Sequence, residues 1–176
     1  MAATTPAEQI KDATTAWVRA VTRKNDPRFV TDQFCSDGIL WGTVSQTIRG
    51  GANGGGNEEG GAIERYFDFF AKIPGIQVKK SEDNVEQITS DVYVNNANVK
   101  WMHDGLDAPL DARMTFIYRR DASHANGWCI FQLHSSAMPE LNADLKAISG
   151  GGEPKLESYK KEQERKLLIA PFFRLF

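Results

Sequence analysis

The chain has 176 residues, of which 41% are hydrophobic and 25% are charged, as expected for a soluble globular domain with its own core. Its formal net charge of -2 leaves no surplus of cations to neutralise phosphates, so we expect no nucleic-acid partner. No apolar run approaches the roughly 18 residues needed to cross a bilayer, and the start, MAATTPAEQ, has neither a basic nor an apolar stretch. We therefore expect a soluble protein with no membrane contact and no targeting segment in this chain.

The chain is predicted to begin with two helices. Thr5 can cap a helix that starts at Pro6, with Glu8 reaching back to the cap, and apolar side chains then recur at helical spacing as far as Val21. The Asn-Asp-Pro sequence at 25–27 should end this helix and open a short second one that runs to about residue 34.

A strand, a loop and a third helix are expected next. The β-branched and aromatic residues from Ile39 to Ile48 predict a strand. The polar, glycine-rich run from Gly50 to Gly61 is typical of a flexible surface loop. Residues 62–70 then predict an aromatic-rich helix that is stopped by the Pro-Gly pair at 74–75.

The second half of the chain predicts a sheet. Short links favour antiparallel pairing of the expected strands, which are 76–80, 84–89, 91–103, 110–120 and 128–136. Helices gathered on one face of such a sheet define an α+β domain, and a strongly curved sheet would leave a pocket at its open end. We expect this domain to span residues 1–148. Residues 149–176 should form a glycine linker, a charged helix and an apolar tail that packs on the domain or on a partner subunit.

Cysteine and histidine spacing predicts no metal centre. Cys35 and Cys129 form neither a CxxC pair nor a disulfide framework, and we expect both to be small buried apolar residues. His103, His124 and His134 lie on three separate segments without metal-ligand spacing. Neither a nucleophile-elbow motif nor a Walker phosphate loop is present.

The last predicted strand ends in polar residues. Alternation places Gln132, His134 and Ser136 on one side, and Leu133 and Ser135 on the other. These polar groups either line a site or are exposed to solvent where the strand ends.

Polar groups elsewhere in the predicted elements are open to the same two interpretations. Thr43 and Ser45 share a side of their strand, which is either half-polar or part of a site. Tyr66 either packs in the core or directs its hydroxyl to a site. Arg113 and Thr115 also share a strand face, where an exposed arginine is the simpler interpretation.

The string His-Ser-Ser-Ala-Met-Pro-Glu at residues 134–140 resembles a motif of the calcium/calmodulin-dependent kinase II association-domain-like proteins, within the nuclear-transport-factor-2-like superfamily. Within that group, the chain is most similar to the iota-class carbonic anhydrases of algae and bacteria. The resemblance covers roughly residues 10–140. Weaker matching segments occur in the expected order: Thr43-Val44-Ser45, Tyr66-Phe67 and Phe116-Ile117-Tyr118-Arg119.

The resemblance implies a cone-shaped fold with a deep pocket, a homodimer, and reversible hydration of carbon dioxide to bicarbonate. Members of the family occur with and without a metal. The scattered histidines favour the metal-independent form, with zinc or manganese as the alternative cofactor. The residues that match catalytic pocket positions are Thr43, Tyr66, His134, Ser135 and Ser136. Those we expect to contact substrate are Trp41, Ser45, Phe67, Arg113 and Thr115.

The implied mechanism needs an apolar wall for carbon dioxide and hydroxyl groups that orient the attacking water. The wall could be supplied by Trp41, Phe67, Leu133 or Phe116. The hydroxyls of Tyr66, Thr43 and Ser136 could hold this water. His134 could relay the proton of the water at neutral pH. Hydroxyl donors would stabilise the developing bicarbonate.

Two other functions remain open. The same fold serves as a non-catalytic association module or a small-anion binder, and the apolar tail favours such a role. A ketosteroid isomerase or polyketide cyclase would need an acidic base in the pocket, and the nearest candidates, Asp104, Asp107 and Asp111, are expected near a hairpin. By resemblance, an algal chain would be plastid-located; otherwise a cytoplasmic or periplasmic location is expected.

Overall fold

The structure is a computed structural model that describes residues 4–22, 26–43, 45, 47–50 and 63–138. Most of the predicted glycine-rich loop and the whole of residues 149–176, with the predicted linker, helix and apolar tail, lie outside the described residues. Among the described residues, no helix is long and apolar enough to cross a membrane.

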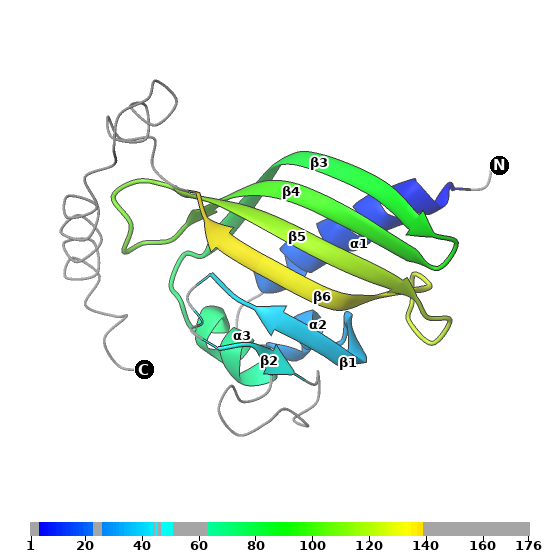
Figure 1. Ribbon diagram of the computed structural model, residues 1–176. Helices are drawn as coiled ribbons and strands as arrows, with labels where there is room; N and C mark the ends of the chain where they lie inside the picture. Colours follow the sequence, from blue (N-terminus) through cyan, green and yellow to red (C-terminus); the bar gives the residue numbers. More distant parts are fainter. Residues whose placement is uncertain (1–3, 23–25, 44, 46, 51–62, 139–176) are drawn as a thin grey trace, which may run out of the picture. The chain divides into compact units, whose positions relative to one another are not determined.

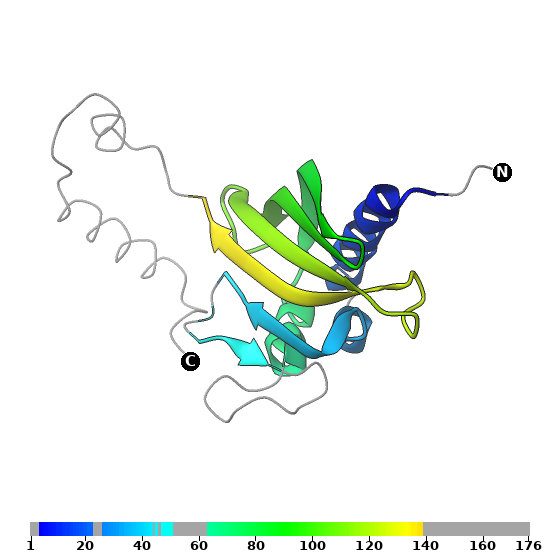
Figure 2. The same ribbon diagram turned by 45° about the vertical axis from the view of Figure 1, so that its right-hand side comes forward.

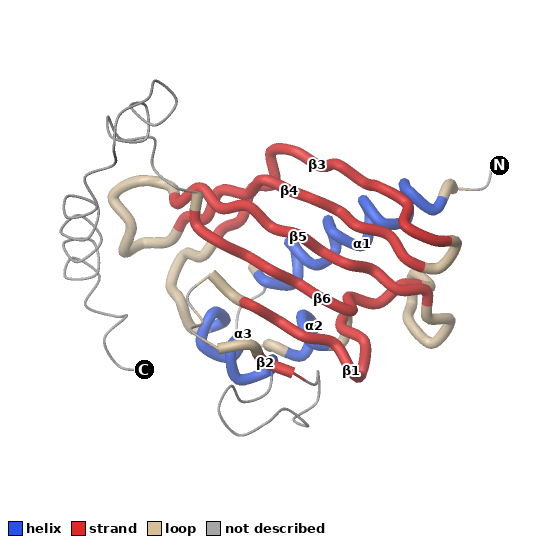
Figure 3. Tube along the Cα trace, in the orientation of Figure 1, coloured by secondary structure: helices blue, strands red, loops and turns tan. Residues whose placement is uncertain are grey.

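A six-stranded sheet in the order β2-β1-β6-β5-β4-β3 forms the frame of the domain. Its long strands are β3 (Gln77–Thr89), β4 (Val92–Met102), β5 (Leu110–Arg120) and β6 (Trp128–Ala137), each antiparallel to the next. Strands β1 (Phe34–Trp41) and β2 (Arg49–Gly50) extend the sheet beyond β6 (Figure 3). The predicted α+β class with a curved sheet is confirmed. The sheet is not wholly antiparallel, however, because β1 runs parallel to β6.

Helix α1 (Pro6–Val21) crosses one face of this curved sheet (Figures 1 and 2). The predicted capping box is present: the Glu8 N–H donates to Thr5 Oγ1 at 3.3 Å, and the Thr5 N–H donates to Glu8 Oε2 at 2.8 Å. The helix buries Ile10 and Trp17 against the sheet. Two shorter helices, α2 (Arg28–Thr31) and α3 (Ile63–Ala71), complete the helical side of the domain.

The first strand departs from the prediction. We expected a strand from Ile39 to Ile48, but β1 begins at Phe34 and ends at Trp41. Between Phe34 and Ile39, β1 contains an irregularity where its register against β6 shifts. Gly38 allows the backbone to approach closely there, since a Cβ would lie 2.8 Å from the Ile130 carbonyl oxygen. The two strands predicted over 76–89 are likewise one strand with a register shift after Lys80.

The prediction that Cys35 and Cys129 form no disulfide was wrong. Cys35 on β1 and Cys129 on β6 are both fully buried, as expected, but they form a disulfide. The pairing of β1 beside β6 brings two cysteines 94 positions apart in sequence to a Cα–Cα distance of 4.9 Å. Spacing along the chain carries no sign of this pairing, which depends on the sheet order.

Candidate functional site

A small cavity, here called the inner pocket, lies between the helices and the sheet. It is largely apolar and encloses about 10 Å³, close to the volume that one water requires. Its lining residues from the helices are Trp17, Tyr66, Phe67 and Phe70, and those from the sheet and the turn after β1 are Leu40, Gly42, Thr43, Trp101, Met114, Leu133 and Ser135.

Three hydroxyl groups belong to the inner pocket. Thr43 Oγ1 and Ser135 Oγ form a hydrogen bond of 2.5 Å between the turn after β1 and strand β6. The third hydroxyl is that of Tyr66, which α3 supplies, and both Ser135 and Tyr66 are buried. Gly42 is packed so closely against Tyr66 that a Cβ at this position would overlap the phenol ring. Glycine at this position therefore sets where the Tyr66 hydroxyl lies.

Two residues that line the inner pocket have an indole N–H group without a hydrogen-bond partner among the described residues. They are Trp17 and Trp101, whose Nε1 atoms are buried. A buried donor without a partner costs about 1–3 kcal/mol, so a bound acceptor would be favoured there. The rings of Trp17 and Trp101 meet edge to face, with centroids 6.4 Å apart.

A cation also lies beside the pocket phenol. The guanidinium of Arg49 lies 5.4 Å from the centre of the Tyr66 ring. Burial lowers the pKa of Arg49, with nearby Arg65 acting in the same direction and Tyr66 opposing it. The guanidinium stays charged at neutral pH, so it adds positive potential beside the inner pocket.

A second hollow, here called the outer groove, lies on the opposite face of the sheet. It is open, has a volume of about 660 Å³ and is lined mainly by polar residues of β3 to β6. Arg113 Nε donates to Ser136 Oγ at 3.2 Å, and Thr115 Oγ1 donates to Asn96 Oδ1 at 2.8 Å. Thr115 is paired across the sheet with His134, which also lines the groove.

The predicted site residues are thus divided between the two faces. Thr43, Tyr66, Phe67 and Ser135 meet in the inner pocket. The predicted residues that line the outer groove are His134, Ser136, Arg113 and Thr115. The structure therefore places His134 and Ser136 together, and separates both from the hydroxyls of Thr43 and Tyr66.

Two further predicted residues line neither hollow. Trp41 is 49% exposed, with its ring centre 5.6 Å from that of His134, so it does not form the expected apolar wall. Strand β1 ends at Trp41, and the chain then turns. Thr43 therefore does not share a strand face with Trp41. Ser45 lies in this turn, where its Oγ donates to the Thr47 carbonyl oxygen at 2.7 Å and accepts from Arg49 Nε at 3.3 Å.

Sequence reasoning missed Gly42, Trp17 and Trp101 as pocket residues. A glycine beside a predicted site threonine is a signal of close backbone approach, and it could have indicated Gly42. The tryptophans gave no such signal, because an apolar position on a helix or strand predicts burial but not a missing partner for its N–H group.

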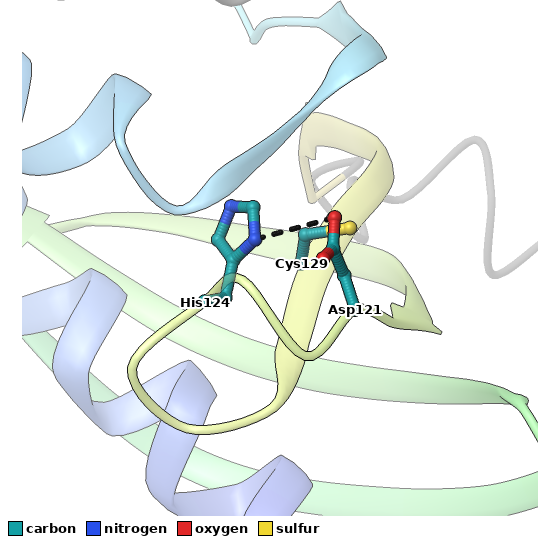
Figure 4. A group of neighbouring side chains, drawn as sticks. All are labelled: Asp121, His124 and Cys129. Carbon is teal, nitrogen blue, oxygen red and sulfur yellow. Dashed lines mark ion pairs between the residues drawn. The ribbon is translucent and has the colours of Figure 1, made fainter.

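Metal-ligating side chains gather elsewhere in the described part of the chain. Asp121, His124 and Cys129 have ligand atoms within 4.8 Å of one another (Figure 4), and none of the three lines either hollow. The lining of the inner pocket, as far as the structure describes it, contains no histidine, cysteine or carboxylate. It therefore provides neither a metal-ligand set nor the acidic base of a ketosteroid isomerase.

No protein-family model matches this chain, and no curated protein matches it. Solved structures do. A candidate calcium/calmodulin-dependent protein kinase II association domain from Xanthomonas campestris has 26% identity and a TM-score of 0.63, over 79% of this chain and 95% of that one. A candidate ketosteroid isomerase from Parabacteroides distasonis has 19% identity and a TM-score of 0.59, over 78% of this chain and 92% of that one.

A third solved structure of the same kind is a nuclear-transport-factor-2-like protein of unknown function from Pseudomonas putida. It has 15% identity and a TM-score of 0.61, over 77% of this chain and 89% of that one. Together these similarities show that the chain has the nuclear-transport-factor-2-like fold. Proteins of one fold can differ in function, so the function must be argued from the site.

Proposed function

We propose that the chain is a carbonic anhydrase that hydrates carbon dioxide reversibly to bicarbonate in the inner pocket, with the attacking water held by hydroxyl groups of the protein. The observation that carries the proposal is the arrangement of Thr43, Ser135 and Tyr66 around one largely apolar cavity. Its volume of about 10 Å³ fits the attacking water alone, so the proposal requires the side chains around it to move apart to admit carbon dioxide. An apolar wall suits carbon dioxide, and the hydroxyls suit the water and the charged product.

In the proposed reaction, the water oxygen bonds to the carbon of carbon dioxide while one C–O π bond breaks to give an oxyanion. As the water gives its proton to a hydroxyl, that hydroxyl gives up its own proton to a base in solution, since His134 lies on the other face of the sheet. The N–H groups of Trp17 and Trp101 and the nearby charge of Arg49 would stabilise the bicarbonate. Hydroxyls do not lower the pKa of water as a metal does, so we expect slower turnover than in a zinc enzyme.

Adjacent serines give a matched test of this site. Ser135 lines the inner pocket, whereas Ser136, the next residue, lines the outer groove. Carbon dioxide hydration is followed by stopped-flow with a pH indicator, with and without a chelator. Ser135→Ala should lower kcat/KM by about 10- to 100-fold, while Ser136→Ala leaves it unchanged. Hydration no faster than in buffer, in both metal-loaded and chelated native protein, would reject the proposal, as would equal losses in the two variants.

A second candidate function is that of a non-catalytic association module. The similarity to a candidate association domain, at 26% identity over 79% of the chain, favours it, and the comparisons support this function more directly than they support catalysis. It predicts a homodimer or larger assembly in solution. Sedimentation equilibrium of the full chain tests it, because a monomer at micromolar concentration would exclude this function. An assembly that hydrates carbon dioxide would have both properties.

A further inference from the structure

A second cluster of reactive side chains lies where the β5–β6 turn meets β1 (Figure 4), and none of its residues lines either hollow. His124 Nδ1 lies 3.4 Å from Asp121 Oδ2, and each of these residues has a ligand atom within 4.8 Å of the sulfur of Cys129. That sulfur is bonded to the sulfur of Cys35 on β1. The ligand atoms of Asp121, His124 and Cys129 therefore lie within 4.8 Å of one another, and the Cys35 sulfur reaches the cluster only through its bond to Cys129.

Contacts outside the cluster fix the orientation of its imidazole and its carboxylate. His124 Nε2 lies 3.2 Å from the Phe34 carbonyl oxygen, which can only accept a hydrogen bond, so Nε2 carries the proton. The Nδ1 atom of His124 is then left to face Asp121 and Cys129. Zinc-binding histidines are oriented in the same way, because their second ring nitrogen usually donates to a carbonyl or a carboxylate.

The carboxylate is fixed as well. Asp121 Oδ1 accepts from the N–H and the Oγ of Ser123, at 2.9 and 2.7 Å, which leaves Oδ2 directed to the cluster. The turn is closed by the His124 N–H donating to the Asp121 carbonyl oxygen at 3.1 Å. Ser123 Oγ also lies 3.5 Å from His124 Nδ1. Asp121 and His124 are thus held by contacts that do not involve the sulfurs.

We propose that reduction of the Cys35–Cys129 disulfide converts this cluster into a zinc site, with Cys35 Sγ, Cys129 Sγ, His124 Nδ1 and Asp121 Oδ2 as the four ligands. A dithiol reductant supplies two electrons, the S–S bond breaks, and the reductant becomes a disulfide. The two protein thiols then lose their protons as zinc binds. The sulfurs must separate to roughly 3.8 Å, the span of two Zn–S bonds of about 2.3 Å at a tetrahedral angle.

The proposed site explains how β1 could stay attached to β6 in both redox states. The disulfide links the two strands when oxidised, and the zinc ion would link the same two cysteines when reduced. Strand β1 leads directly into the turn that carries Thr43 of the inner pocket. In the oxidised chain only Asp121 and His124 remain as ligands, too few for a tight zinc site.

The test compares metal binding by the reduced and oxidised full chain. The chain is reduced with dithiothreitol, freed of it by anaerobic gel filtration, and titrated with zinc against a chromophoric chelator. The reduced chain should bind one equivalent, and the oxidised chain should bind none that competes with the chelator. Cobalt added to the reduced chain should give thiolate-to-cobalt charge-transfer bands. Saturating zinc should raise the Tm of the reduced chain by on the order of 5–10 °C.

Two histidine variants distinguish zinc binding at the four-ligand site from zinc binding by the two thiols alone. His124→Ala should weaken zinc binding by about tenfold or more, whereas His103→Ala, in another turn, should bind as the native chain does. Equal binding by both variants would overturn the proposal. Absence of the charge-transfer bands in the reduced native chain would overturn it without any variant, so the test holds even if His124→Ala does not fold.

Discussion

Replacing Thr14 by valine should lower the free energy of unfolding by about 2–6 kcal/mol, because this threonine completes a buried polar network between α1 and the sheet. Its hydroxyl donates to the Ile10 carbonyl oxygen at 3.0 Å and accepts from Asn95 Nδ2 at 2.7 Å. Tyr118 lies 2.9 Å away and supplies the third hydrogen bond. A hydroxyl has one donor and two acceptor sites, so every site is used.

The magnitude follows from what Thr14→Val leaves behind. Valine keeps the shape and has a helix propensity close to that of threonine, so the change is mainly the loss of the hydroxyl. Asn95 Nδ2 and the Tyr118 hydroxyl then remain buried without a partner, since both residues are at most 1% exposed. Each orphaned group costs about 1–3 kcal/mol. The Ile10 carbonyl oxygen adds little to this free-energy cost, because a carbonyl inside a helix also accepts a hydrogen bond from a backbone N–H of the same helix.

Urea unfolding followed by circular dichroism measures this effect, and the Tm should fall by on the order of 10 °C. Thr14→Ser is the matched control: it keeps the hydroxyl and should recover most of the loss. The reasoning would be refuted if Thr14→Val stayed within about 0.5 kcal/mol of the native chain, the range of an ordinary surface change. It would equally be refuted if the serine and valine variants lost the same amount.

The remaining predictions concern pH and the inner pocket. Burial raises the pKa of Tyr118 above the ordinary value of 10.0, so its stabilising effect is complete below about pH 10 and is lost as the pH rises further. Urea unfolding between about pH 9 and pH 11 should show this fall, and Tyr118→Phe should make the fall shallower. Gly42→Ala should displace the Tyr66 ring and lower carbon dioxide hydration by about tenfold or more in stopped-flow assays. Gly50→Ala is its control, because a Cβ there meets only a side-chain methyl of Ile39 at 4.0 Å, and equal activity in both variants would contradict the reasoning.

Much of the fold could be predicted from local patterns in the sequence. The capping box at Thr5 and Glu8 placed the start of α1 correctly, because a cap depends only on residues within one turn. Strand β5 matched its predicted bounds, since it alternates regularly between buried and exposed residues. The division of residues 132–136 into two faces was also correct.

The relations between distant segments could not be predicted in this way. The Cys35–Cys129 disulfide, and with it the cluster around His124, depends on β1 lying beside β6, which no local pattern encodes. The prediction that Trp41 forms an apolar wall of the site was wrong for a related reason. The strand was assumed to continue past residue 41, but the chain turns at Gly42, and alternation no longer applies beyond the end of a strand.

A single irregularity in β6 decides which polar residue reaches the inner pocket. Ile130 faces the core, so simple alternation would turn His134 inward with it, as the expected site required. The register between β5 and β6 shifts by one residue at Phe131, however, and beyond this shift Leu133 and Ser135 face the core instead. Because a one-residue slip moves every later side chain to the other face, the shift places a hydroxyl in the pocket and an imidazole in the outer groove. Any mechanism assigned to this pocket must therefore work with a hydroxyl from β6 and must pass its proton to a group other than His134.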